Sequence, residues 1–487
     1  TVEEGGSLIF DNYAHLVQGE NVTNNPNSGE ITFKRLSSKI FRLDYTLWSS
    51  PVEDQMLKAF SSGTLDNRFY KYNETSDAYS LIGSPSTTEM DEGKSYLIRV
   101  VNTHPAYVAP AEGAEEPEGT RWQGEFTGRP RSGNIDVPVT NQLNGFNAVG
   151  NPYPSPINIY DFFDGNAGMI NPGSALYFWR KKNETGTGSY ARVTKMMYTR
   201  NMTNDFGDTG EGYFDGTPSS WVINPGQGFI VKVVQAGNVH FNNGMRVGLN
   251  NQQFFRNAQD QDEVTMSRMW LNINGSEGQF AQAGIGYTDV TTLDIDYGWD
   301  GRAFVNDGNM SLFSLAGEEK LGIQARPAFD ASDVVPMGYN AAAAGTYTIS
   351  LDHFDGVFTT DVDIFLKDNL LGGVTHDLKA GNYTFETEGG INTSRFEVVY
   401  AEVLGTDNPV LDPNNVIMYK NGTSININTG VLNMEGVAIY DTRGRMLYSK
   451  DGINATETVI ENLHSDQQVL IIQINTDKGR VTKRIIF

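Results

Sequence analysis

Apolar and polar residues alternate most regularly in the C-terminal part of the sequence. At 425–428 isoleucine alternates with asparagine, as in a half-buried strand. Apolar positions at 437–439 and 446–448 flank the turn Asp441–Gly444, where glycine can adopt a positive φ. The pattern predicts two strands joined by a tight turn, preceded by a third strand.

The same pattern continues to the last residue of the sequence. A short apolar run at 469–472 is followed by the turn Lys478–Gly479 and then by a further strand-like segment at 481–486. Short runs bounded by such turns predict a small β-sandwich of the immunoglobulin-like kind. An ordinary C-terminal β domain is the alternative interpretation.

The rest of the chain also favours short strands and turns. It contains 52 glycines with 26 Phe and 22 Tyr, and long helical periodicity is scarce. Only residues 54–60 and 157–163 suggest a turn or two of helix. We therefore predict an all-β protein with several β-sandwich or jelly-roll-like domains in tandem.

Two segments of the N-terminal half resemble each other. GKSYLIRVV at 93–101 matches GQGFIVKVV at 226–234, and each follows a segment with tryptophans, prolines and an Asn-Glu-Thr triplet. The spacing is too long for a solenoid repeat. We predict two related β units, 1–140 and 141–250, although glycine-rich strands can resemble each other by chance.

Polar segments suggest where the remaining domains begin. We predict a linker at 251–263, a β-sandwich domain at 264–404, a second linker at 405–414 and a C-terminal domain at 415–487.

The C-terminal domain resembles the sorting domains of the type IX secretion system of Bacteroidetes. The resemblance rests on IYDTRGRMLYSK at 439–450, INATETVIENL at 453–463, QVLIIQI at 468–474 and GRVTKRIIF at 479–487. It is closest to the flavobacterial variant grouped as type C, because a segment like NNVIMYKNGTSININ precedes the hairpin. The Leu-x-x-Gly-x-Tyr of the common type A signal is missing.

This resemblance implies export across the outer membrane, to the cell surface or the medium, after recognition by the translocon and its shuttle β-barrel. We do not expect an enzyme, because the sequence contains no catalytic motif. The positions that match the motif and would be recognised are Gly444, Arg445, Gly479, Val481, Lys483, Arg484, Ile485 and Phe487.

The composition of the chain limits the kinds of partner and site that we expect. The net charge of −23 makes nucleic acid an unexpected partner. Basic and acidic side chains balance within 411–487, so the excess acidity lies in 1–410. There is no cysteine, which removes disulfides and thiolate sites. No run approaches the ~18 apolar residues of a membrane-spanning helix. The polar start is not a signal peptide, so we expect residue 1 to be a mature N-terminus or an internal position.

One acidic segment could bind a cation. Asp294, Asp296 and Asp300 alternate with other residues around a glycine, and such carboxylates can surround calcium. The spacing is not that of an EF-hand, and a solvated acidic turn is the alternative. Otherwise we expect no cofactor.

Other catalytic signatures are missing from the sequence. The six histidines lack metal-site spacing, and no nucleophile-elbow motif surrounds a serine. Stacking on sugars is possible for the tryptophans at 48, 122, 179, 221, 270 and 299, although most aromatics in β domains belong to the core. We expect an adhesive, glycan-binding or scaffold protein, and the alternative is a secreted glycan hydrolase or an accessory region of one.

Overall fold

The structure is a computed structural model. It describes residues 1–3, 5–19, 22–109, 117, 119–180, 190–201, 218–248, 265–276, 278–305, 310–400, 416–421, 423–430, 432–461, 463 and 468–487. The predicted linkers 251–263 and 405–414 lie outside these residues. The chain divides into two compact units, the first comprising Thr1–Thr265, Asp289–Arg302 and Ile323–Ala325 and the second the remainder.

The N-terminal part of the first unit contains two sheets with strand orders β1-β2-β7 and β3-β6-β4-β5. Their strands are β1 Ile9–Phe10, β2 Ile31–Ile40, β3 Tyr45–Ser49, β4 Phe69–Asn73, β5 Ala78–Leu81, β6 Ser95–Arg99 and β7 Thr120–Gly128, with the short helix α1 at Leu57–Phe60. The inward faces of these strands and of α1 supply a core that includes Phe33, Trp48, Phe60, Phe69 and Phe126.

The following part of the first unit has a five-stranded sheet, β13-β12-β11-β15-β9, and the two pairs β10-β14 and β16-β8. The elements are β8 Ile135–Val139, β9 Phe146–Gly150, β10 Ile157–Asn158, helix α2 Ile159–Gly165, β11 Leu176–Trp179, β12 Tyr190–Val193, β13 Tyr198–Thr199, β14 Val222–Ile223, β15 Gly228–Lys232 and β16 Gly237–Phe241. Asn158 caps the N-terminus of helix α2, because its side chain accepts hydrogen bonds from the N–H groups of Tyr160 and Asp161. Phe162 and Phe163 then anchor the helix in the core.

The two similar segments occupy corresponding places in these sheets. Strands β6 and β15 each follow a turn whose glycine has a positive φ, +64° at Gly93 and +73° at Gly226. Each turn bonds to a strand of the other part: Ser49 N–H donates to Gly226 O, and Gly150 N–H donates to Gly93 O, both at 2.9 Å. The two parts therefore share backbone hydrogen bonds as well as side-chain contacts.

The second unit contains a long sheet with the order β25-β24-β27-β22-β20-β21-β18-β17-β23-β26. The strands are β17 Ser267–Gly275, β18 Phe280–Tyr287, β20 Ser311–Ala316, β21 Glu319–Arg326, β22 Val334–Ala341, β23 Gly345–Phe354, β24 Phe365–Asp368, β25 Val374–Asp377, β26 Tyr383–Thr387 and β27 Gly390–Val399. Side chains from both ends of this order share one core, as in a sandwich: Tyr339 of β22 lies 5.2 Å from Phe385 of β26 between ring centroids. A short strand, β19 Gly301–Arg302, pairs with β21, and both β19 and residues Ile323–Ala325 of β21 are grouped with the first unit.

The C-terminal residues form a three-stranded sheet, β28-β29-β32, and a four-stranded sheet, β31-β30-β33-β34. The strands are β28 Ile417–Asn421, β29 Ser424–Asn428, β30 Met434–Asp441, β31 Met446–Ala455, β32 Glu457–Ile460, β33 Val469–Thr476 and β34 Gly479–Ile486. Alternate residues of these strands, such as Ile425, Ile439 and Ile472, meet in a separate core.

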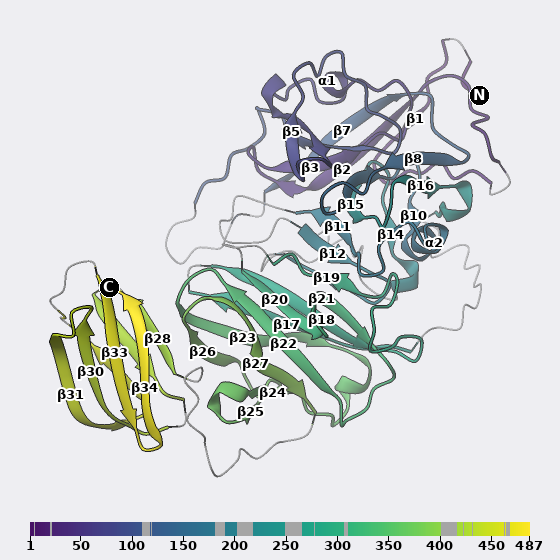
Figure 1. Cartoon of the computed structure of the whole chain (residues 1–487). Coiled ribbons are helices and arrows are strands. Elements are labelled where there is room, and N and C mark those ends of the chain that lie inside the picture. Colours follow the sequence, from purple (N-terminus) through teal and green to yellow (C-terminus); the bar gives the residue numbers. More distant parts are fainter. Residues whose placement is uncertain are drawn as a thin grey trace. The chain divides into compact units, whose positions relative to one another are not determined.

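Strands dominate every part of the chain (Figure 1), so the predicted all-β class is confirmed. Both segments suggested as helical contain one, at α1 and α2. Among the residues that the structure describes, no helix has the length and apolar character needed to cross a membrane.

Candidate functional site

A pocket lies in the first unit, between strands of its two β parts. It encloses about 730 Å³ of empty space, counted with its open mouth. Its described lining residues are Arg35, Leu36, Ser37, Ser38, Thr46, Leu47, Trp48, Phe178, Trp179, Arg180, Tyr198, Asn224, Pro225, Gly226, Gln227 and Gly228. We call it the inter-sheet pocket.

Strand β2 brings polar groups to one wall of the pocket. Side chains alternate along a strand, so Arg35 follows Ile31 and Phe33 on the core-facing side and is itself buried. The register with β7 then shifts after Leu36, and two residues, Ser37 and Ser38, occupy the space opposite one. Such a bulge bends a strand and redirects its side chains, and bulges are frequent beside functional sites.

The turn from β14 to β15 forms a second wall. The carbonyl of Asn224 accepts from Gln227 N–H at 3.1 Å, and the side-chain Oε1 of Gln227 accepts from Asn224 N–H at 3.0 Å. Gly226 permits this turn through its positive φ. Asn224 is 3% exposed, and its buried Oδ1 has no hydrogen-bond partner in the structure. A buried amide oxygen without a donor is costly, so this position favours an added donor group.

Aromatic side chains complete the lining. The indole of Trp179 is held edge-on between Tyr79 and Tyr190, at centroid distances of 5.5 and 5.4 Å. The two tyrosine hydroxyls lie 3.0 Å apart, and burial raises the pKa of both, so they stay protonated. The buried Nε1 of Trp179 has no hydrogen-bond partner. The pocket therefore combines a fixed aromatic group with unsatisfied polar atoms.

The charge of the lining contrasts with the rest of the chain. The net charge of the protein is −23, whereas the described residues that line the pocket include two arginines and no Asp or Glu. Arg35 and Arg180 give the lining a formal charge opposite in sign to that of the whole molecule.

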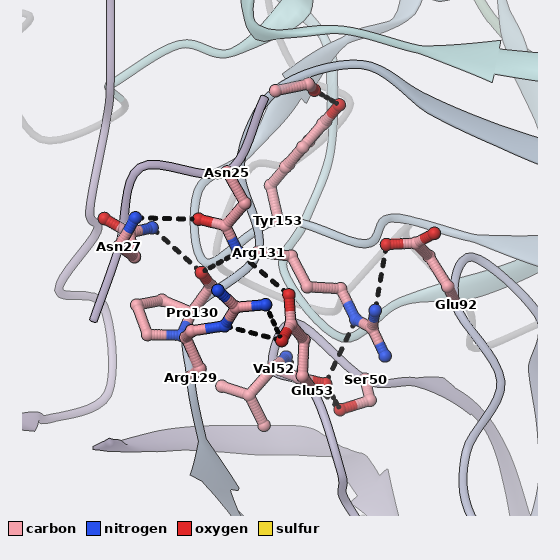
Figure 2. Close-up of polar contacts among 11 residues, drawn as sticks. Asn25, Asn27, Ser50, Val52, Glu53, Glu92, Arg129, Pro130, Arg131 and Tyr153 are labelled. Carbon is pink, nitrogen blue, oxygen red and sulfur yellow. Dashed lines mark hydrogen bonds and ion pairs between the residues drawn. The ribbon is translucent and has the colours of Figure 1, made fainter. Parts of the chain in front are cut away.

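A polar network joins Asn25 and Asn27 to Glu53 and to the segment at 129–131 (Figure 2). Arg129 binds Glu53 through its Nε at 2.6 Å, and Asn25 donates to the same carboxylate at 2.9 Å. Asn25 and Asn27 also donate to the carbonyl of Pro130, at 3.0 and 2.8 Å. Asn25, Asn27 and Arg129 use their side-chain donors in these bonds within the protein, so we assign the network a structural role.

A second guanidinium in Figure 2 is more deeply buried. Arg131 donates to the carbonyl of Val52 at 3.1 Å and pairs with Glu92 at 2.9 Å, and its side chain is 6% exposed. Nearby, the guanidinium of Arg246 is bound to neutral oxygens, among them Ser155 Oγ at 2.8 Å, and lies 4.7 Å from the ring of Tyr153. Burial lowers the pKa of Arg246 to about 10.

The three aspartates considered for calcium have separate contacts. Asp300 is fully buried, and its two oxygens accept from Asp296 N–H at 2.7 Å and Ala325 N–H at 2.8 Å. Burial raises the pKa of Asp300 to about 7, against the opposing effect of those two N–H groups. The carboxylate of Asp296 binds Thr292, and Asp294 is exposed. The described residues include no group of three or more His, Asp or Glu placed to hold a metal ion.

The eight residues matched to the sorting motif differ in their surroundings. Gly444 and Gly479 occupy the hairpin turns with φ of +81° and +137°. Val481, Ile485 and Phe487 face the core of the C-terminal sandwich, where Phe487 also exchanges two backbone hydrogen bonds with Gln468. The other three, Arg445, Lys483 and Arg484, are at least partly exposed.

Ile486 was not among the eight predicted residues. It is far more exposed than Val481 and Phe487, the buried apolar residues of that set. Its side chain is 76% exposed and lies opposite Val469, which is also exposed. The alternation of 481–487 contains the signal that could have identified it, because Ile486 falls on the face opposite Val481 and Phe487.

Of the six tryptophans, Trp48 and Trp179 line the inter-sheet pocket. Trp221 and Trp270 are buried, and Trp122 packs edge-on against Trp48 at 5.9 Å. Trp299 lies 5.9 Å from Tyr160. The sequence offered no reason to prefer one of the six tryptophans as a ligand contact. Among the described residues, only Trp48 and Trp179 of the six line this pocket.

Comparison with known families adds two matches. Residues 404–487 match a family model described as a domain of unknown function, DUF8694. A search of curated proteins finds no match. Residues 1–400 match a second model, also described as a domain of unknown function, DUF8693. Since that match spans most of the chain, the protein belongs to the DUF8693 family.

Proposed function

We propose that this protein is a binding protein exported by a type IX secretion system, and that residues 415–487 are the signal recognised by the translocon and its shuttle β-barrel. The observation that carries the proposal is the placement of the motif. Its residues belong to a small β-sandwich with its own core, in which the motif glycines make the turns and the motif apolar residues fill the interior. Such a module can be recognised whatever protein precedes it.

The outer face of the four-stranded sheet is the surface that we propose for recognition. Val469 and Ile486 form an exposed cross-strand pair, and Arg484 lies opposite Ile471 on the same face. Exposed apolar groups beside a cation are typical of protein interaction sites.

Deletion of residues 415–487 tests the export role. In a bacterium with the secretion system, the truncated protein produced with a leader peptide should accumulate in the periplasm, while the full chain with the same leader reaches the surface. Ile486→Asp should reduce surface display without changing the unfolding midpoint of the purified protein. Val459→Asp, at an exposed apolar position of β32 in the other sheet, is the matched control. Normal display of the deletion variant would refute the proposal.

For residues 1–400 we propose ligand binding, as in an adhesin, in preference to glycan hydrolysis. The inter-sheet pocket supports this choice. Glycosidases of the common kind need two carboxyl groups flanking the bond, whereas the described lining of this pocket contains arginine, amide, hydroxyl and aromatic groups. Those groups can bind a ligand without cleaving it.

A further inference from the structure

We propose that strand β34 binds its partner in the export machinery by β-strand addition, and that the added strand is an extended segment with two acidic side chains. This inference rests on the proposed export role of residues 415–487 and names the way in which the partner is bound. Three features of β34 support it: its unpaired backbone groups, its regular geometry and the spacing of its exposed cations.

The hydrogen-bond register leaves one edge of β34 unpaired. The strand lies at the end of the order β31-β30-β33-β34 (Figure 1). Phe487 and Gln468 exchange two backbone hydrogen bonds, at 3.0 and 3.3 Å, and the register with β33 then runs without a shift to Gly479. In an antiparallel pair, residues that exchange such bonds alternate with residues whose N–H and C=O groups point away from the partner strand. The backbone groups of residues 480, 482, 484 and 486 therefore point outward, and they bond to none of the described residues.

The other edges of this sandwich are less suited to strand addition. Strand β31, at the opposite end of the same sheet, pairs with β30 through two register shifts, and such bulges turn an edge away from a partner. The edges of the other sheet, β28 and β32, have only five and four residues. Strand β34 has eight residues and no proline. A long, regular, unpaired edge is the template on which extended segments add.

The exposed side chains of β34 favour an acidic segment. Because side chains alternate along a strand, Arg480, Thr482, Arg484 and Ile486 share the outer face, and all four are exposed. Arg484 makes no hydrogen bond or ion pair with the described residues. Lys483 belongs to the other face and pairs with Glu388 at 2.9 Å, so it is not part of this row. Opposite charges on facing residues of two strands stabilise their pairing.

The row predicts a sequence pattern for the added strand. In an antiparallel addition, its first residue lies opposite Ile486, its third opposite Arg484 and its seventh opposite Arg480. The expected pattern is therefore an apolar residue, then an acidic residue two positions later and another four positions after that. These side chains would all lie on the outer face of the extended sheet.

A second copy of this chain is a poorer occupant of the edge. If two β34 strands paired in antiparallel fashion about Thr482, Arg480 of each copy would face Arg484 of the other. Like charges on directly opposed residues destabilise strand pairing. The same cations that favour an acidic segment therefore oppose self-association through this edge.

Two synthetic heptapeptides test the predicted pattern on the full chain. One is Ile-Thr-Glu-Thr-Thr-Thr-Glu, and its control has lysine in place of both glutamates. We expect the glutamate peptide to bind at least about tenfold more tightly, because the control converts two attractive pairs into repulsive ones. It should also slow hydrogen exchange at the amides of residues 482, 484 and 486. Equal affinities, or no binding of the glutamate peptide, would overturn the inference.

Reversing the two charges of β34 should reverse the preference. The double variant Arg480→Glu, Arg484→Glu should bind the lysine peptide more tightly than the glutamate peptide, a result that misfolding cannot produce. The matched control is Arg443→Glu, Lys450→Glu, which makes the same change of charge at exposed positions outside β34. The control should still prefer the glutamate peptide. An unchanged preference in the β34 variant, or a reversed one in the control, would overturn the assignment.

A proline tests the backbone edge during export. Thr482→Pro removes an outward N–H group, and proline is tolerated in edge strands where the N–H faces solvent. Thr482→Val keeps the N–H and is the control. We expect the proline variant to show at least about fivefold less surface display than the valine variant, with an unchanged unfolding midpoint. If the proline lowers the midpoint, display of the Arg480→Glu, Arg484→Glu variant decides in its place.

The same display assay separates this inference from the proposed function. Normal display of the folded proline variant, or of the charge-reversed variant if that one decides, overturns strand addition at β34. The signal role then stands as long as deletion of 415–487 keeps the protein in the periplasm. Normal display of the deletion variant overturns the signal role as well.

Discussion

The backbone N–H of Ser49 donates to the carbonyl of Gly226 over 2.9 Å, although the two residues belong to different β parts of the first unit. Gly150 and Gly93 make the reciprocal bond at the same distance. These bonds place the turn at Asn224–Gly228 beside Trp48 and so form the inter-sheet pocket. The junction between the two parts is thus also the wall of the candidate site.

Substitution of Gly226 should weaken this junction. Its φ is +73°, and an added Cβ would lie 3.2 Å from the ring of Phe126. We expect Gly226→Ala to lower the free energy of unfolding by about 2 kcal/mol, since the left-handed conformation alone costs a non-glycine residue about 1 kcal/mol. Gly168→Ala is the control, because Gly168 has φ of +82° and no atom within 4 Å of an added Cβ. Equal losses in urea denaturation would show that the contact with Phe126 has no effect.

The two arginines of the network in Figure 2 should differ in their contribution to stability. The side chain of Arg131 is 6% exposed and that of Arg129 is 44% exposed. Arg131→Gln removes the hydrogen bond from a buried charged group to the carbonyl of Val52, which then keeps only the one from Ser50 Oγ, and it also removes the pair with Glu92, so it should cost about 2 kcal/mol. Arg129→Gln should cost less than about 1 kcal/mol, because water screens an exposed pair. A larger loss of unfolding free energy for Arg129→Gln than for Arg131→Gln in denaturation experiments would contradict the burial described for the two side chains.

His15 should make the stability of the protein depend on pH. Burial, with a smaller contribution from Arg35, lowers the pKa of His15 from 6.5 to about 4. Between these values the unfolded chain binds a proton that the folded chain does not, so stability rises with pH across this range. The contribution is complete above pH 6.5 and is lost as the pH falls toward 4. His15→Gln should therefore give a shallower fall in the free energy of unfolding from pH 7 to pH 4, and an identical slope would refute the assignment.

Asp300 should stabilise the first unit without calcium. Both of its oxygens accept backbone N–H groups, and an asparagine could accept only one of them. We expect Asp300→Asn to cost about 2 kcal/mol in EDTA and in millimolar calcium alike. Asp294→Asn, at an exposed position, should change stability by less than about 0.5 kcal/mol. A loss seen only with calcium would instead support the cation site that the sequence suggested.

Local patterns were enough to predict most strands of the C-terminal sandwich. The alternation at 425–428 and the turns at Gly444 and Gly479 appear in β29 and in two hairpins. The apolar run at 469–472 lies in β33, where Leu470 and Ile472 are buried, Ile471 is half-buried and Val469 is exposed. Strand β32 lacks a clear apolar run of its own and was not predicted from the residues.

The inter-sheet pocket could not be predicted, because its parts are distant in the sequence. Arg35 continues the inward face of β2, which is a local pattern, but nothing near it indicates that Arg180 and Asn224 line the same space. The inclusion of 289–302 in the first unit has the same cause. Its contacts, such as that of the Tyr297 hydroxyl with the carbonyl of Phe163, join residues separated by more than a hundred positions.

The most direct test of the account is a fusion of residues 415–487 to an unrelated fluorescent protein with a leader peptide. Surface fluorescence that is sensitive to added protease would be measured in a bacterium with an active type IX secretion system. We predict that the fusion reaches the outside and that the same fusion with Ile486→Asp reaches it less. A fusion that folds and fluoresces but stays in the periplasm would contradict the account.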